Sequence, residues 1–434
     1  MKIAIVGAGL AGLSAAYDLL AAGHTVTLFE ASDQAGGLAA GFQDEAWEWP
    51  LEKFYHHIFE SDKAIIEMTQ ELGIGDKLFF PTPRTSILYE GGIYPFSNPV
   101  DWLKFPGYNI FDFFRFGLVG AFIRFTKFWR YLEKHTAVSW LHRFYGQRIY
   151  DVSWKPLLIG KFGEHYDKVN MAWLWARLHV RSFKLGYFVG GFQAFIDALE
   201  TAVTQRGATI QFNTPVQAIT PTNGKLNITA DGQTEQFDAC LVTTSPKLFS
   251  KMAPDLPQNY LGQLLKLKSM GAVVLTLALK RPFMPNSNTY WLNIPATSTN
   301  KEENELPFLA LVEHTNYIDR QHYGGDHILY CGDYINPDHP YMSMSQSELE
   351  QLFTASLQKI NPDFQPDWIR KIWLFRASYA QPVPFVNHSQ NIPTLQTPIP
   401  GLYFASMSQV YPWDRGTNFA VEIGRRVAQL INEV

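Results

Sequence analysis

A glycine-rich turn near the amino terminus constrains the fold of this chain more than any other feature. The turn reads Gly7-Ala8-Gly9-Leu10-Ala11-Gly12. Residues 2–6 before it have the apolar pattern of a buried parallel strand, and residues 10–20 repeat apolar side chains at helical spacing. Residues 25–29 predict a second strand, which ends at Glu30. The pattern indicates a β-α-β unit of the kind that binds dinucleotides.

Each glycine of the turn has its own physical role in such a unit. Gly7 allows the sharp passage from strand to helix, Gly9 lets a pyrophosphate approach the backbone, and Gly12 lets the helix pack closely on the sheet. The helix N-terminus offers free N–H groups and a positive dipole end to phosphates. Glu30 is placed to accept hydrogen bonds from an adenosine ribose. The alternative is a glycine-rich turn without a ligand, which the flanking strands and Glu30 disfavour.

Length and composition limit the kinds of domain, partner and cofactor that this chain can have. With 434 residues the chain is long enough for two domains. Its formal net charge of −4 gives no overall field that favours nucleic acid. Cys240 and Cys331 are too few for a zinc or iron–sulfur site, so we expect no metal. No second glycine-rich dinucleotide motif follows, so we expect no separately bound NAD(P)H, with electrons leaving to oxygen, a quinone or another acceptor.

Three later segments also have recognisable patterns. Val189-Gly190-Gly191-Phe192 opens an amphipathic helix that leads to a strand and to hairpins with Asn223-Gly224 and Asp231-Gly232 turns. Residues 240–244 predict a buried strand that ends before Pro246. Residues 401–405 predict a short strand, and residues 418–430 predict a closing helix.

With these four segments the chain resembles the flavin amine-oxidase-type superfamily, which includes protoporphyrinogen oxidases, phytoene-type desaturases and, more distantly, UDP-galactopyranose mutases. The resemblance implies an α/β fold in which a Rossmann-like FAD-binding domain of the GR2 type is interrupted by an α+β substrate domain. The FAD-binding domain would comprise residues 1–85, 188–255 and 395–434. The substrate domain would comprise residues 86–187 and 256–394.

The resemblance also assigns cofactor contacts, with FAD as the cofactor. The positions expected to contact it are Gly7, Gly9, Leu10, Ala11 and Gly12 at the pyrophosphate, Glu30 and Ala31 at the ribose, Gly36, Gly37 and Leu38 along the cofactor, Val216 at the adenine, and Asn418 and Phe419 at the flavin. The chain departs from the family at two places. Leu38 stands where several amine oxidases have arginine, and Ala405-Ser406 stand where a glycine is usual.

Two segments are expected to border the flavin and supply candidate catalytic residues. Residues 49–57 include Lys53 and His56, a suitable inventory for proton transfer or substrate orientation. Residues 411–416 include Trp413 and Arg415, which could bind substrate. The structural alternatives are that the first segment only covers the cofactor and that Asp414 forms an ion pair with a neighbouring arginine.

Residues 105–131 are basic and aromatic, and two interpretations stay open. The longest uncharged run is too short to span a bilayer. The segment could lie at a membrane interface, or it could be a helix of the substrate domain that packs on both sides. We therefore expect a cytoplasmic protein, with peripheral membrane contact through this segment as the alternative, and an unknown oligomeric state.

The function expected from the resemblance is FAD-dependent hydride removal from an apolar or aromatic small molecule, such as a tetrapyrrole, an isoprenoid or an amine, onto flavin N5. A flavin-dependent sugar-nucleotide mutase without net redox change is the alternative, which His56-His57-Ile58-Phe59 faintly favours. A flavin-binding scaffold is a third, non-enzymatic interpretation.

Overall fold

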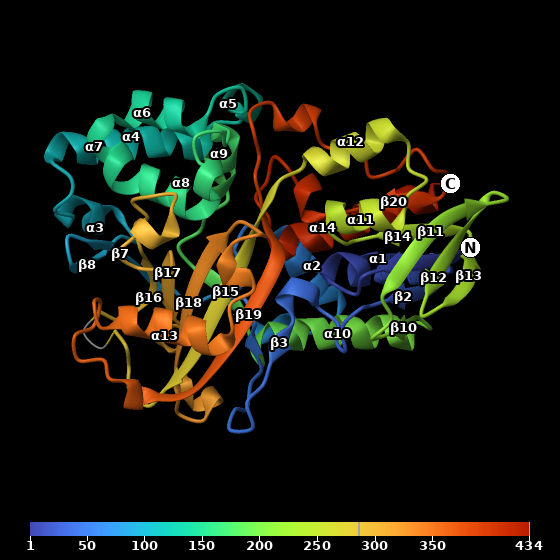
Figure 1. Ribbon diagram of the computed structural model, residues 1–434, viewed down its shortest axis with the longest axis horizontal. Helices are drawn as coiled ribbons and strands as arrows, with labels where there is room; N and C mark the ends of the chain where they lie inside the picture. The colour runs from blue at the N-terminus through green and yellow to red at the C-terminus, as the bar shows by residue number, and fades with distance from the viewer. Residues whose placement is uncertain (285–286, 434) are drawn as a thin grey trace.

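A five-stranded parallel sheet carries the amino-terminal unit. The computed structural model describes residues 1–284 and 287–433. The strand order is β10 (Thr209–Gln211), β2 (Thr25–Phe29), β1 (Lys2–Val6), β14 (Ala239–Val242) and β20 (Leu402–Phe404). The chain thus returns to this sheet from three distant segments, as Figure 1 shows in the right half of the molecule.

The two faces of this sheet are covered differently. Ile3 and Ile5 point to a core shared with α1 (Leu10–Ala21), α10 (Gly191–Gln205) and α14 (Thr417–Asn432). Ala4 and Val6 point the other way. The elements that cover them are the meander of β11 (Val216–Thr222), β12 (Lys225–Ala230) and β13 (Gln233–Phe237), followed by α11 (Pro246–Met252) and α12 (Gln258–Lys266). The alternation follows from the period of two along a strand.

A second sheet of seven strands forms the lower left of Figure 1. Helix α13 (Gln346–Leu357) packs through Leu349 and Phe353 against one face, where Val273 and Leu275 are buried. The strands in spatial order are β19 (Ile369–Pro382), β15 (Ser269–Leu279), β18 (His327–Ile335), β17 (Ala310–Glu313), β16 (Thr289–Asn293), β7 (Arg84–Tyr89) and β8 (Gly92–Pro95).

Short strands link the two sheets. They pair as β3 (Gly41–Phe42) with β4 (Leu51–Glu52), and as β5 (Ile58–Phe59), β9 (Leu185–Phe188) and β6 (Leu78–Phe79) in that order. Helix α2 (Lys63–Glu71) lies beside α14. The segment between β4 and β5 contacts both parts of the molecule, because the His56 ring lies 5.9 Å from that of Phe192 in α10 and the Tyr55 ring lies 4.9 Å from that of Trp291 in β16.

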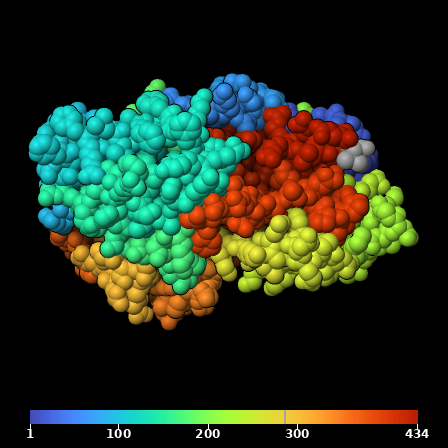
Figure 2. Space-filling model, turned by 90° about the horizontal axis from the view of Figure 1, so that it is seen from above, coloured from blue at the N-terminus to red at the C-terminus, as the bar shows by residue number. Residues whose placement is uncertain are grey.

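A helical region occupies the upper left of Figure 1 and one end of the face seen in Figure 2. It contains α3 (Pro99–Lys104), α4 (Ile110–Phe125), α5 (Trp129–Leu132), α6 (Ala137–Tyr145), α7 (Gln147–Ile149), α8 (Lys155–Phe162) and α9 (Met171–His179). Its own core includes Trp140, Leu141 and Trp173.

Helix α4 is packed on one side only. Phe116 and Ile123 are 7% and 0% exposed, whereas Phe111, Leu118 and Phe125 are 80%, 74% and 75% exposed. The interpretation that this helix packs on both sides is therefore wrong. No helix among the described residues is long and apolar enough to cross a membrane.

Candidate active site

The turn between β1 and α1 needs two of its glycines for its own packing. Gly7 has a φ of +104°, and a Cβ on Gly12 would lie 2.0 Å from the Gly7 carbonyl oxygen. Gly9 is different, because its φ is −71° and a Cβ there would meet only the Gly37 Cα, at 3.9 Å. The protein leaves the outer side of Gly9 clear, which is the arrangement a ligand phosphate requires.

A second glycine pair lies against this turn. The Gly36 N–H donates to the Ala8 carbonyl (2.9 Å), and Gly9 and Gly36 form a parallel bridge. Gly36 and Gly37 have φ values of +108° and +57°. Leu38 follows in a 3₁₀ turn, Gly37–Ala39. The two glycine motifs therefore come together from opposite ends of the first β-α-β unit.

The start of α1 fits a pyrophosphate. Gly9 is the N-cap residue, no side chain caps the helix, and its first turn, which contains Leu10 and Ala11, holds no acidic residue. The first-turn N–H groups are thus free to bind phosphate oxygens. The start of α1 is uncapped, and Gly9 beside it has an open outer side. These residues therefore fit the pyrophosphate of FAD.

Glu30 has a structural role that the sequence did not reveal. Its Oε2 accepts the Ala8 N–H (2.8 Å), and its Oε1 accepts the N–H and hydroxyl of Ser32 (2.9 and 2.7 Å). The carboxylate therefore fixes the glycine turn directly. Ala31 is exposed and Val216 is buried. The contacts of Glu30, Ala31 and Val216 with a ribose and an adenine stay predictions.

The beginning of α14 is also uncapped. Gly416 is its N-cap residue without a side-chain hydrogen bond, and the Thr417 hydroxyl is buried without a partner among the described residues. Asn418 Oδ1 accepts the Ile65 N–H of α2 (3.2 Å). Phe419 stacks on Trp413, with ring centroids 5.9 Å apart. The structure thus uses the Asn418 side chain to join two helices and aims the helix start at the segment that contains Trp413.

Glu52 anchors the segment that follows β4. It is 1% exposed, and its Oε1 accepts the Phe192 N–H (2.8 Å) at the start of α10 and the Tyr187 hydroxyl (2.9 Å). Burial raises the pKa of Glu52 to about 7. A Cβ on Gly191 would lie 2.5 Å from the Pro50 carbonyl oxygen, so glycine is needed where α10 meets this segment.

The histidines of this segment are neutral at pH 7. Burial, followed by the positive charge of Arg415, lowers the pKa of His56 to about 4. Burial and nearby cations lower the pKa of His57 to about 3. His56 Nδ1 contacts the Phe54 carbonyl oxygen. A carbonyl accepts only a proton-bearing nitrogen, so His56 Nε2 carries the lone pair. Lys53 is half-buried, and its backbone N–H donates to the Ala40 carbonyl (3.3 Å).

Trp413 and Arg415 lie at the junction with the helical region. The Trp413 ring stacks on Trp175 of α9, with centroids 5.3 Å apart. The Arg415 guanidinium contacts the Tyr334 hydroxyl, and its Cζ lies 5.2 Å from the centroid of that ring. Asp414 does not pair with its neighbour Arg415. It accepts from Arg177 (2.6 Å) and Gln381 (3.1 Å) instead.

The structure therefore brings His56, Trp413 and Arg415 into one region and adds residues that sequence reasoning missed. Arg177 and Lys161 belong to this region, because their charges affect one another. Neither lies in a motif, so no local signal marks them. Among the described residues no group of three metal-ligating side chains is present.

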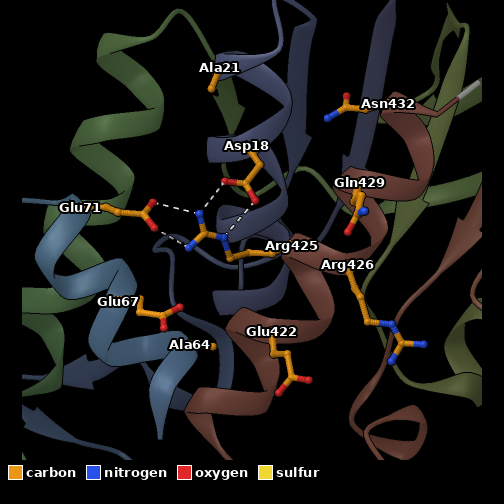
Figure 3. Close-up of a pocket in the computed structure, with 10 residues that line it drawn as sticks. All are labelled: Asp18, Ala21, Ala64, Glu67, Glu71, Glu422, Arg425, Arg426, Gln429 and Asn432. Atoms are coloured by element: carbon orange, nitrogen blue, oxygen red, sulfur yellow. Dashed lines mark hydrogen bonds and ion pairs between the residues drawn. The ribbon is translucent and has the colours of Figure 1, made fainter.

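A surface hollow lies away from this region. It has a volume of about 650 Å³ and is lined by α1, α2 and α14 (Figure 3). The Arg425 guanidinium forms ion pairs with Asp18 (3.0 Å) and Glu71 (2.7 Å) in this hollow. These ion pairs join α1, α2 and α14, so we assign the residues that line the hollow a structural role.

Comparison with known proteins shows the family of this chain. A family model described as flavin containing amine oxidoreductase matches residues 10–432. The chain is 42% identical over 78 residues to 15-cis-phytoene desaturase of Synechococcus elongatus and 26% identical over 174 residues to mitochondrial protoporphyrinogen oxidase of Nicotiana tabacum. These matches span 18% and 39% of this chain but only 16% and 34% of those relatives.

Solved structures share the fold along the whole chain. An oxidoreductase from Methanosarcina mazei has a TM-score of 0.76 at 18% identity, and covers 99% of this chain and 100% of its own. Cyclohexylamine oxidase from Brevibacterium oxydans has a TM-score of 0.73 at 15% identity, and covers 100% and 98%. At this identity the likeness shows the fold, and the predicted fold class is confirmed. The chain therefore belongs to the family of flavin-containing amine oxidoreductases, and FAD is the cofactor that its glycine turn fits.

Proposed function

We propose that this protein catalyses FAD-dependent oxidation of an apolar or aromatic small molecule. The observation that carries the proposal is the clear, uncapped turn at Gly9, together with the aromatic stack of Trp175, Trp413 and Phe419 at the start of α14. Bound FAD supplies a hydride acceptor at N5. Neither the structure nor the relatives named above favour the sugar-nucleotide mutase, and we do not propose it.

The chain's own residues have three tasks in this reaction. The start of α1 would hold the pyrophosphate, and the uncapped start of α14 would present its positive dipole end to the flavin. Trp175 is 2% exposed, so the half-buried Trp413 ring that stacks on it is the one left to contact a flat substrate. Lys53, His56, Trp413 and Arg415 remain the candidate catalytic residues, with neutral His56 able to accept a proton at Nε2.

Anaerobic flavin reduction tests the proposal. The purified protein should be yellow, with a flavin band near ~450 nm, and a panel of amines, isoprenoids and porphyrinogens should contain a compound that bleaches it. A colourless protein, or a yellow one that no compound reduces, would contradict the proposal. A flavin-binding scaffold predicts the second result.

We also propose that the exposed side of α4 lies on a lipid membrane. Phe111, Phe114, Leu118, Phe122 and Phe125 recur at spacings of three and four residues and are 50–80% exposed. They form one apolar stripe along the helix, opposite the buried Phe116 and Ile123. Phe128 and Tyr131 of the next segment extend it, at 71% and 56%. A contiguous apolar face of this kind marks an interaction surface.

Charge favours an anionic bilayer as the partner. Residues 98–149 contain eight Lys and Arg residues but only three Asp and Glu, whereas the remaining sequence has 28 and 37. The three acids are engaged within the region. Asp101 and Asp112 accept backbone N–H groups at helix starts, and Glu133 is 5% exposed. A basic face with apolar side chains is suited to a membrane interface.

Vesicle sedimentation tests this contact. The protein should bind phosphatidylcholine vesicles that contain about 30% phosphatidylglycerol and should bind pure phosphatidylcholine less well. Substituting Phe111, Phe125 and Phe128 together by serine should abolish binding. Substituting Leu248, Leu265 and Leu352, which are exposed on other elements, should leave it unchanged. Equal binding by both triple variants would contradict the contact.

A further inference from the structure

Four cationic side chains converge where the helical region meets the segment before α14. They are Lys161 on α8, Arg177 on α9, Arg181 just after α9, and Arg415. Lys161 is 5% exposed, and its Nζ lies 4.4 Å from the centroid of the Tyr334 ring, over which Arg415 also lies. Two cations therefore share one aromatic ring in the interior.

The pKa shifts of these groups show that they interact with one another. Burial, followed by the charges of Arg177 and Arg415, holds the pKa of Lys161 well below its ordinary value. Burial and Arg177 lower the pKa of Arg181 and that of Arg415, each to about 10. Arg181 is exposed, so its side chain reaches solvent at the edge of this cluster.

The negative charge nearby does not balance this cluster. Asp414 is engaged with Arg177 at 2.6 Å. The buried Asp333 is engaged with a different cation, Lys301, at 2.7 Å. Within the described chain the buried Arg415 Nε has no hydrogen-bond partner. Arginine keeps its proton at any physiological pH, and uncompensated charge in the interior is strongly unfavourable. Folding alone gives no reason to collect such a cluster.

We propose that Arg181, Arg415 and Lys161 bind an anionic group, a carboxylate or a phosphate, of the substrate. The inference rests on the proposed function and sharpens it. The substrate would be an amphiphile whose apolar body lies against the half-buried Trp413 ring and whose anion meets the guanidinium groups. Arginine donors suit such oxyanions because their N–H groups match them in pairs.

The cofactor's own pyrophosphate does not account for the cluster. That pyrophosphate is expected at the start of α1, whose turn is made by Gly7, Gly9 and Gly12. The cations come from α8, α9 and residues 411–416, and none comes from the β1–α1 unit. The two anion sites are thus built by separate parts of the chain.

Ligand titration of the FAD-loaded protein tests the inference. Benzoate, phenyl phosphate, benzyl alcohol and benzylamine present the same ring with different charge, and the visible flavin spectrum reports their binding. At least one of the two anions should bind about tenfold or more tighter than benzyl alcohol and benzylamine. The better of the two probes identifies the oxyanion as carboxylate or phosphate.

Variants locate the site. Arg181→Gln and Arg415→Gln should each weaken binding of the preferred anion about tenfold or more and leave benzyl alcohol unchanged. Arg281→Gln, whose guanidinium lies over Trp368 elsewhere, should bind as the wild type does. If Arg415→Gln fails to fold, Arg181→Gln decides the result.

Three results would overturn the inference: neutral or cationic probes that bind as tightly as the anions, anions that fail to bind at about 10 mM, and an Arg181→Gln variant with unchanged affinity. A protein without FAD would instead refute the proposed function. A yellow protein without preference for anions refutes only this inference.

Discussion

The turn after β1 and the helical region around α4 and α9 are built on opposite principles. In the turn, backbone N–H groups form the site, and side chains matter mainly by being absent, as at Gly9 and Gly12. In the helical region, side chains form both the outer apolar face and the inner cationic cluster. A backbone site tolerates almost no change in shape, whereas a helix face can change its chemistry without changing its fold.

The same substitution in the two regions should have opposite effects. Gly12→Ala places a Cβ 2.0 Å from the Gly7 carbonyl oxygen, so we expect a loss of more than about 4 kcal/mol and little folded protein. Gly117→Ala in α4 meets no atom within 4 Å and should stabilise the protein by about 0.5–1 kcal/mol. Expression yield and thermal unfolding measure both. A well-folded Gly12→Ala protein would remove the basis of the contrast.

Alanine substitutions of a buried and an exposed phenylalanine on α4 should have different effects on stability. Phe116 is 7% exposed, so Phe116→Ala should cost about 3–5 kcal/mol in the free energy of unfolding. Phe111 is 80% exposed, so Phe111→Ala should change stability by less than about 0.5 kcal/mol. Urea unfolding without vesicles measures the difference. Equal losses would show that the apolar stripe is covered by protein.

Glu52 gives the third test, through pH. Because burial raises its pKa from 4.5 to about 7, the folded protein holds a proton that the unfolded chain has released in this range. Its contribution to stability is complete below pH 4.5, falls as pH rises to 7, and is constant above. Glu52→Gln lacks this titration, so the wild type should lose about 3 kcal/mol relative to the variant between these limits. Urea unfolding of both proteins below pH 4.5 and above pH 7 tests this prediction. A difference in unfolding free energy between wild type and variant that stays the same at the two pH values would contradict it.

Sequence reasoning is strongest where local chemistry determines structure. The roles of Gly7 and Gly12 follow from the strand-turn-helix pattern. The Asn223-Gly224 and Asp231-Gly232 hairpins have positive φ at both residues, as such turns require. These features depend on neighbouring residues in the chain, so the amino-acid pattern alone predicts them.

The remainder depends on which distant elements meet. Asp414 pairs with Arg177, more than two hundred residues away, and not with adjacent Arg415. The side of α4 that faces outward is set by its partners α6 and α9, which the periodicity of its own sequence does not reveal. The proposed domain boundaries and the contacts assigned to Leu38 and Phe419 stay predictions.

Gly9→Ala tests the central claim most directly, because it separates cofactor binding from folding. The backbone at Gly9 suits alanine, and the new Cβ would meet only the Gly37 Cα at 3.9 Å, so the protein should fold as the wild type does. The methyl group would occupy the space required by the pyrophosphate. The FAD dissociation constant, measured by titrating the apoprotein, should therefore rise about tenfold or more. A folded Gly9→Ala protein that binds FAD with unchanged affinity would contradict the account.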